Sequence, residues 1–138
     1  MMKKSNKKGF TLVELIVVIA IMAILAAVLV PTVTSKIKDA NKSAADSSCS
    51  ALANSIQADV MSALAADNNK CVGQHGTITI KDNKIELGTD IASGDSKIKI
   101  SLADNTTIKI EHDDYKTEWY YTVDINAKVT KVTPSTGN

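Results

Sequence analysis

One acidic residue, Glu14, interrupts an apolar run near the N-terminus. Between Phe10 and Val30 every residue except Thr11 and Glu14 is apolar. An ionised carboxylate costs on the order of 2.5 to 3.5 kcal/mol at the centre of a bilayer, and somewhat less near its surface. A functional partner for this carboxylate would compensate the cost. The alternative is a glutamate that only reaches towards the lipid surface.

The apolar run is long enough to cross a membrane. Its 21 residues span about 31 Å as a helix, against about 30 Å for a hydrocarbon core. Four lysines precede the run without an acidic residue among them; they are Lys3, Lys4, Lys7 and Lys8. Without them the formal charge of +1 becomes −3. The positive-inside rule therefore predicts a cytoplasmic N-terminus and an external C-terminal portion.

A secretory signal peptide is an alternative interpretation of the same segment. Such a peptide has a shorter apolar region that ends in a small-residue cleavage site. Here Ala26 and Ala27 lead into Val28, Leu29 and Val30, so length and composition alone leave both interpretations open.

Glu14 belongs to a longer pattern, which consists of a short basic leader, Gly9, the aromatic Phe10, a glutamate four positions later and the apolar run. This pattern resembles the class III leader of type IV prepilins and pseudopilins. The resemblance implies that a prepilin peptidase cleaves after Gly9 on the cytoplasmic side and that the new Phe10 amine is methylated. It also implies three segments. Residues 1–9 would be the leader, residues 10–30 the transmembrane and filament-core helix, and residues 31–138 the extracellular head with the second half of the helix.

The same resemblance implies roles for Glu14 and Pro31. In a filament the Glu14 carboxylate would pair with the Phe10 amine of a neighbouring subunit and so set the register between subunits. Breaking such a buried pair from one side costs about 3 to 5 kcal/mol. Pro31 lies where pilins commonly carry a helix-kinking proline, and it leaves the carbonyl of Ala27 without its helical partner. Many pilins have glycine where this chain has Ala23, and alanine disfavours extensive melting between Ala23 and Pro31.

The helix is expected to continue from Thr32 to about Ala65. Two apolar stripes at a spacing of four predict which face is buried. The first consists of Val33, Ile37, Ala40 and Ala44, and the second of Leu52, Ile56, Val60 and Leu64.

After Asn69 the apolar period changes to two, which predicts six short strands. Their apolar residues are Ile78 and Ile80; Ile85 and Leu87; Ile98, Ile100 and Leu102; Ile108 and Ile110; Trp119, Tyr121 and Val123; and Val129. Asp82-Asn83, Asp104-Asn105 and Asn126-Ala127 are suited to the tight turns between them. We therefore predict an α+β fold. A long N-terminal α-helix has an apolar half that is transmembrane, and its C-terminal half packs on an antiparallel sheet of about four to six strands, as in pilins.

Cys49 and Cys71 form an even pair in the segment expected outside the cytoplasm, so a disulfide is one interpretation and two free buried thiols are the other. A helix running unbroken from Cys49 to Ala66 would cover about 25 Å, and the following extended residues would return only about 17 Å. The remaining gap exceeds the limit of about 6.8 Å for bridged Cα atoms. A bridge therefore requires the helix to end or bend by about Ala63.

No set of residues predicts an enzyme, a metal site or a cofactor. Cys71 with His75 is half a metal site, His112 is isolated, and Asp113 and Asp114 lack an ordered series of further oxygen ligands. The later lysines alternate with acids, so no specific nucleic-acid partner is indicated.

The expected function is that of a structural subunit of a type IV pilus, most simply its major pilin. It would serve adhesion, surface motility or biofilm formation. Its expected partners are identical or related subunits in a helical polymer, the prepilin peptidase, the cytoplasmic membrane and the assembly platform. The precursor would be a single-pass protein of the cytoplasmic membrane, and the product a surface filament. Two alternatives are a pseudopilin of a type II secretion or DNA-uptake filament, and a membrane-anchored extracellular binding module that needs neither Gly9-Phe10 nor Glu14.

Overall fold

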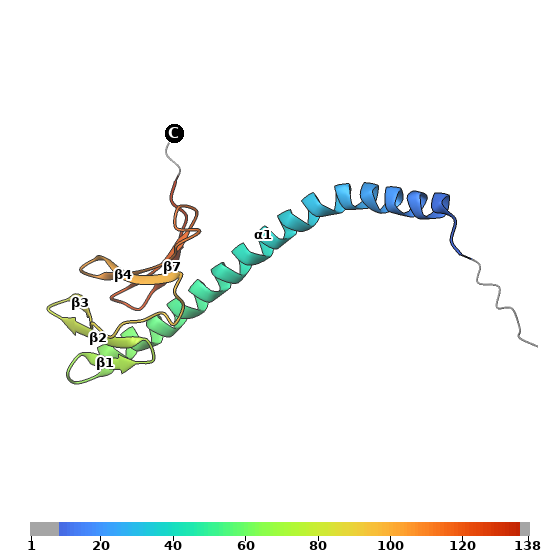
Figure 1. Ribbon diagram of the computed structural model, residues 1–138. Helices are drawn as coiled ribbons and strands as arrows, with labels where there is room; N and C mark the ends of the chain where they lie inside the picture. Colours follow the sequence, from blue (N-terminus) through green and yellow to red (C-terminus); the bar gives the residue numbers. More distant parts are fainter. Residues whose placement is uncertain (1–8, 136–138) are drawn as a thin grey trace, which may run out of the picture. The chain divides into compact units, whose positions relative to one another are not determined.

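The computed structural model describes residues 9–135, so residues 1–8 of the predicted leader lie outside the described part of the chain. A single helix of 54 residues, α1, is followed by seven strands (Figure 1). The helix spans Leu12–Ala65. The strands are β1 (Lys70–Gly73), β2 (Gly76–Lys81), β3 (Lys84–Leu87), β4 (Ile98–Asp104), β5 (Thr107–His112), β6 (Tyr120–Asp124) and β7 (Val129–Val132).

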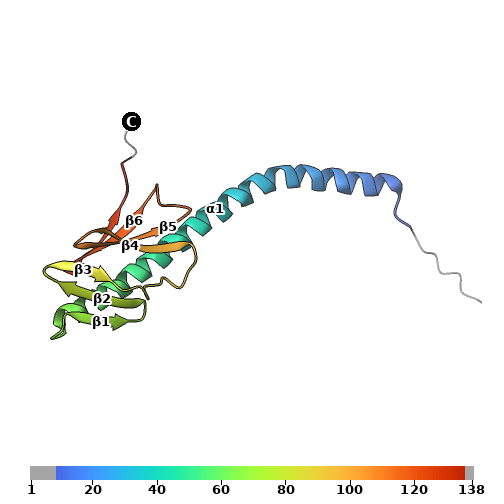
Figure 2. The ribbon, with the colours of Figure 1, turned by 60° about the vertical axis from the view of Figure 1, so that its left-hand side comes forward.

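The chain divides into two compact units within α1. The first is Met1–Asn41 and the second is Lys42–Asn138. In the second unit both sheets lie against the C-terminal part of the helix (Figures 1 and 2). The α+β architecture with a long N-terminal helix is thereby confirmed.

The strands form two antiparallel sheets where the sequence predicted one. The first has the order β1-β2-β3 and the second the order β4-β5-β6-β7, so each sheet is a meander of consecutive hairpins. All six predicted strands are present. The seventh, β1, was not predicted, because its four residues Lys-Cys-Val-Gly carry no alternating apolar pattern.

The predicted turns account for three of the hairpins. Lys81 pairs with Lys84, and both residues between them, Asp82 and Asn83, have positive φ of 50° and 61°. That is the backbone of a type I′ turn, whose twist matches that of the two strands. In the β4–β5 turn the Asp104 carboxylate accepts a hydrogen bond from the backbone of Thr106.

The β6–β7 turn uses the same device. The Asp124 carboxylate accepts hydrogen bonds from the backbone N–H groups of Asn126 and Lys128, both at 2.9 Å. Ala127 between them has φ 58°. These side-chain bonds hold a left-handed alanine that would otherwise be strained.

The core of the second unit lies between α1 and the apolar faces of the sheets. The buried residues of α1 are Ala45, Cys49, Leu52, Ala53, Ile56, Val60 and Ala63. The sheets contribute Ile78, Ile80, Ile85, Ile98, Ile108, Ile110, Tyr121 and Val123, and Trp119 immediately precedes β6. The predicted inward isoleucines and Trp119 are thus confirmed, except that Ile100 is only half-buried and Leu102 is exposed.

The predicted helix stripes need two corrections. Leu64 is 45% exposed, and Ala63 takes the buried place that was assigned to it. Each step of four residues turns an α-helix by about 400°, so a strict spacing of four drifts about 40° per step and leaves the buried face. The first stripe is also exposed, with Val33 at 45% and Ile37 at 54%. Burial against the sheets begins only at Ala45.

The helix continues through Pro31 without a break. Hydroxyl groups beyond the proline donate to carbonyls of the preceding turn: Thr32 to Val28 at 3.1 Å and Thr34 to Val30 at 2.9 Å. Back-bonding of this kind competes with the backbone ladder and bends helices. The bend expected at Pro31 stays a prediction, whereas the segment from Ala23 to Pro31 is helical in the structure.

Candidate functional site

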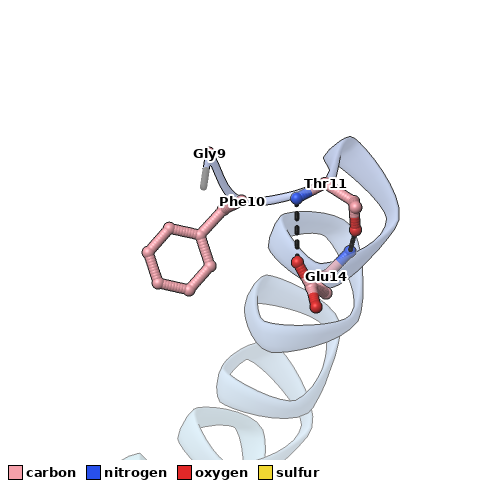
Figure 3. Close-up of a pocket in the computed structure, with 4 residues that line it drawn as sticks. All are labelled: Gly9, Phe10, Thr11 and Glu14. Carbon is pink, nitrogen blue, oxygen red and sulfur yellow. Dashed lines mark hydrogen bonds between the residues drawn. The ribbon is translucent and has the colours of Figure 1, made fainter. Parts of the chain in front are cut away.

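The start of α1 is held by a reciprocal pair of hydrogen bonds between Thr11 and Glu14 (Figure 3). The backbone N–H of Thr11 donates to Oε2 of Glu14 at 2.8 Å, and the backbone N–H of Glu14 donates to Oγ1 of Thr11 at 3.2 Å. The first helical bond, from the N–H of Leu15 to the carbonyl of Thr11, follows at 3.3 Å. This arrangement is a capping box, which satisfies two backbone donors that a helix start otherwise leaves unpaired.

The capping role of Thr11 was not predicted, although the sequence carries its signal. Threonine followed three residues later by glutamate, immediately before an apolar run, is the pattern of a capping box. The capping box fixes the position of the Glu14 carboxylate. The Glu14 carboxylate is turned back towards Thr11, beside the residue that carries the predicted new amine, Phe10 (Figure 3).

Gly9 is not required by this chain's own packing. A Cβ built at Gly9 would meet nothing within 4 Å, and the backbone there is not in the left-handed region that favours glycine. Phe10 is 93% exposed, so the peptide bond between the two residues is open to solvent. Among the described residues, neither packing nor backbone conformation therefore explains a glycine at this position.

The apolar run following Phe10 is exposed along its whole length. The large side chains Leu12, Val13, Leu15, Ile16, Val17, Val18, Ile19, Ile21, Met22, Ile24, Leu25, Val28, Leu29 and Val30 are all at least 50% exposed. By length and composition, α1 contains the one membrane-span candidate among residues 9–135. A continuous apolar surface of this size is stable only in lipid or against other apolar surfaces.

Comparisons with known proteins agree with this arrangement. Residues 4–30 match the family described as the prokaryotic N-terminal methylation motif. Over 106 residues, the chain is 34% identical to the prepilin peptidase-dependent protein A of Clostridium perfringens; the match covers 74% of this chain and 71% of that protein. The chain belongs to the type IV pilin-like proteins. The pilin-like resemblance predicted from Gly9, Phe10 and Glu14 is therefore confirmed.

A second relative matches a shorter part of the pilin-like chain at higher identity. It is the type IV wide pilus major component PilA4 of Thermus thermophilus, 64% identical over 36 residues. This match covers 26% of the pilin-like chain and 28% of that protein's length. No solved structure matches the chain.

The two cysteines of this pilin-like chain lie on different secondary-structure elements, and both are free thiols. Cys49 is fully buried on α1, and Cys71 is half-buried on β1. The condition for a bridge, a helix ending by about Ala63, is not met because α1 runs to Ala65. Gly73 of β1 abuts Asp59, so β1 lies beside the last turns of the helix, well beyond the turn that carries Cys49.

The two aspartates that the sequence singled out, Asp113 and Asp114, are engaged in surface ion pairs. Lys97 pairs with Asp114 and Lys99 with Asp113, each at 2.8 Å. His112 is buried, with Nδ1 accepting a hydrogen bond from the backbone of Asp114. Lysine ammonium groups thus occupy the two carboxylates that were weighed as oxygen ligands.

Proposed function

We propose that this chain is a structural subunit, the major pilin, of a type IV pilus. The observation that carries the proposal is the start of α1: an exposed Gly9-Phe10 bond, a carboxylate at Glu14 directed back towards it, and an exposed apolar helix behind them. The match to a protein named as the major component of a wide pilus supports the major role.

In this proposal the prepilin peptidase removes residues 1–9 on the cytoplasmic side, and the Phe10 amine is methylated. The methylation-motif match over residues 4–30 supports both steps. Residues 10–30 then hold the subunit in the cytoplasmic membrane with residues 31–138 outside, as the basic leader requires. The assembly platform moves the subunit into a helical polymer of identical or related chains, where the apolar surface is covered by other helices.

Glu14 changes its partner on assembly. In the single chain its carboxylate caps its own helix by accepting from the Thr11 N–H. In the filament the carboxylate accepts from the Phe10 amine of a neighbour. Inside an apolar bundle, the attraction of the carboxylate to a positively charged amine is stronger than its bond to the uncharged N–H donor that the amine replaces. The capping box therefore keeps the carboxylate oriented until a partner amine arrives.

The test is mass spectrometry of sheared filaments combined with variants at Gly9. The filament subunit should begin at Phe10 and carry one added methyl group. Because a Cβ at position 9 would meet nothing within 4 Å among the described residues, Gly9→Leu should leave the fold unchanged and isolate the peptidase step. We expect that variant to accumulate as membrane-bound precursor without filaments. Filaments whose subunits retain Met1, or begin after Ala27, would contradict the proposal.

A further inference from the structure

One oxygen of the half-buried Asp59 carboxylate is shielded without a hydrogen-bond partner among the described residues. Asp59 lies on α1, one turn before the buried Ala63. Its Oδ2 atom is shielded from solvent and accepts no hydrogen bond among the described residues. Enclosed oxygens of this kind are rare in folded proteins, and each one calls for a physical explanation.

The carboxyl group of Asp59 fills the space that a side chain on β1 would occupy. A Cβ built at Gly73 would lie 2.2 Å from the carboxyl carbon of Asp59 and from both of its oxygens. The backbone of Gly73 is not in the left-handed region, so the position of the Asp59 carboxyl group is what leaves no room for a side chain there. This contact docks β1 on the last turns of α1.

His75 is the charged group that acts on Asp59 within the described residues. It lies in the two-residue turn between β1 and β2, and its Nδ1 is 3.2 Å from the carbonyl oxygen of Ala92 in the segment before β4. Burial raises the pKa of Asp59, and this effect outweighs the opposing effect of a positive His75. The Asp59 carboxyl group therefore holds its proton more tightly in the folded chain than in the unfolded one.

We propose that Asp59 makes the docking of the β1–β2 hairpin on α1 sensitive to pH. When the carboxyl group is protonated, its shielded oxygen carries no charge and the hairpin is held firmly. When the carboxyl group is ionised at higher pH, Oδ2 is charged with no donor among the described residues, and the hairpin loosens. The sign follows from the raised pKa of Asp59, because the stability is complete below the unfolded pKa and is lost as pH rises through the folded pKa.

The test compares unfolding of the full chain and of Asp59→Asn in nonionic detergent micelles at several pH values. Trp119, the single tryptophan, reports unfolding of the head by fluorescence. The variant cannot ionise, so the ratio of its folding equilibrium constant to that of the natural chain should rise at least about five-fold from about pH 4 to about pH 8. A ratio that stays constant across this range would overturn the proposal.

Gly73→Ala is the second variant, and it keeps the ionisable group. The added methyl group must push the carboxyl group out towards water, so the variant should be less stable in acid and should lose most of the pH dependence. A carbon-detected NMR titration should place the midpoint of Asp59 above 3.8 in the natural chain and shift it downwards in Gly73→Ala. A natural-chain midpoint at or below 3.8 would contradict the proposal.

Asp90→Asn is the matched control. Hydrogen bonds from the Thr77 side chain and backbone hold the pKa of Asp90 below its ordinary value, so its contribution has the opposite sign. This variant should lose stability at neutral pH instead of gaining it. The same gain with rising pH in Asp90→Asn would show a general charge effect and would overturn the assignment to Asp59.

Discussion

Glu14 has two separable properties, a hydrogen-bond acceptor and a negative charge. The acceptor completes the capping box with Thr11. The charge is costly in a membrane and is useful only beside a positive group. The two properties can be tested apart because glutamine also completes a capping box but carries no charge.

Glu14→Gln and Glu14→Ala therefore form a matched pair. Both remove the charge, so both should insert into the membrane at least as well as the natural chain and fold an unchanged head. Only alanine removes the acceptor for the Thr11 N–H, which weakens the helix start. We expect filaments to fail or to form slowly in both, because a neighbouring Phe10 amine would enter an apolar bundle without its counter-charge. Electron microscopy of cells and immunoblots of sheared fractions provide the measurement.

Other outcomes of this pair have distinct meanings. Normal filaments from Glu14→Gln, with none from Glu14→Ala, would make capping the function of this residue. Normal filaments from both variants would remove Glu14 from assembly altogether.

Cys49 and Cys71 should differ in reactivity. Burial raises the pKa of the Cys49 thiol to about 11, and the thiolate is the reactive form. In the folded chain we expect a maleimide to modify the half-buried Cys71 well before Cys49. After unfolding without a reductant, mass spectrometry should find both thiols alkylated. A linked peptide containing both cysteines would show instead that the head closes a disulfide.

At the scale of elements, one cluster joins the C-terminal strands to α1. Oδ1 of Asp46 accepts hydrogen bonds from the hydroxyl of Tyr121 at 2.9 Å and from Nζ of Lys131 at 2.6 Å. The Lys131 ammonium also lies 5.4 Å from the ring centre of Trp119. These contacts link β6 and β7 to the helix in a chain with no cysteine after Cys71.

Removing the charge of Lys131 should loosen β7 without emptying the core. Lys131→Met keeps the aliphatic stem, and we expect a loss of about 0.5 to 1 kcal/mol, since the pair is more than a third exposed. Denaturant unfolding followed by Trp119 fluorescence measures this loss of unfolding free energy. Lys128→Met is the control, because it changes the same charge in the adjoining turn. Equal losses in both variants would mean that net charge, and not the pair with Asp46, is responsible.

This pair also predicts a pH window. The hydrogen bond from Lys131 lowers the pKa of Asp46, and the same contact raises the pKa of Lys131. Its stabilisation is therefore present between the two ordinary values of 3.8 and 10.5. It is lost as pH falls through the lowered pKa of Asp46 or rises through the raised pKa of Lys131. The natural chain and Lys131→Met should converge in unfolding free energy at both extremes, and a constant difference would contradict this mechanism.

At the scale of the whole molecule, apolar and polar surfaces are segregated along the chain. Residues 10–30 expose apolar side chains, while the head pairs its surface charges, as in the contact between Lys109 and Glu111. Filaments assembled through the first segment should dissociate in nonionic detergent, which replaces the apolar contacts. They should survive about 1 M salt, which screens exposed charges only. Sedimentation measures both, and dissociation by salt alone would place the main contacts on the heads.

The sequence alone determined the features that depend on neighbouring residues. The start of α1, the apolar run, six of the strands and the Asp82-Asn83 turn all follow from local spacing and backbone preference. The family resemblance belongs to this class as well, because Gly9, Phe10 and Glu14 lie within one short segment.

Tertiary structure decided what depends on residues far apart in the chain. The strands divide into two sheets, and β1 becomes a strand only because β2 pairs with it. The phase of α1 buries Ala63 in place of Leu64, since packing selects one face of a helix whose period is not four. Asp59 meets Gly73, and Asp46 meets Lys131 across 85 positions. No local pattern encodes such contacts, because they exist only once the helix and the sheets have packed.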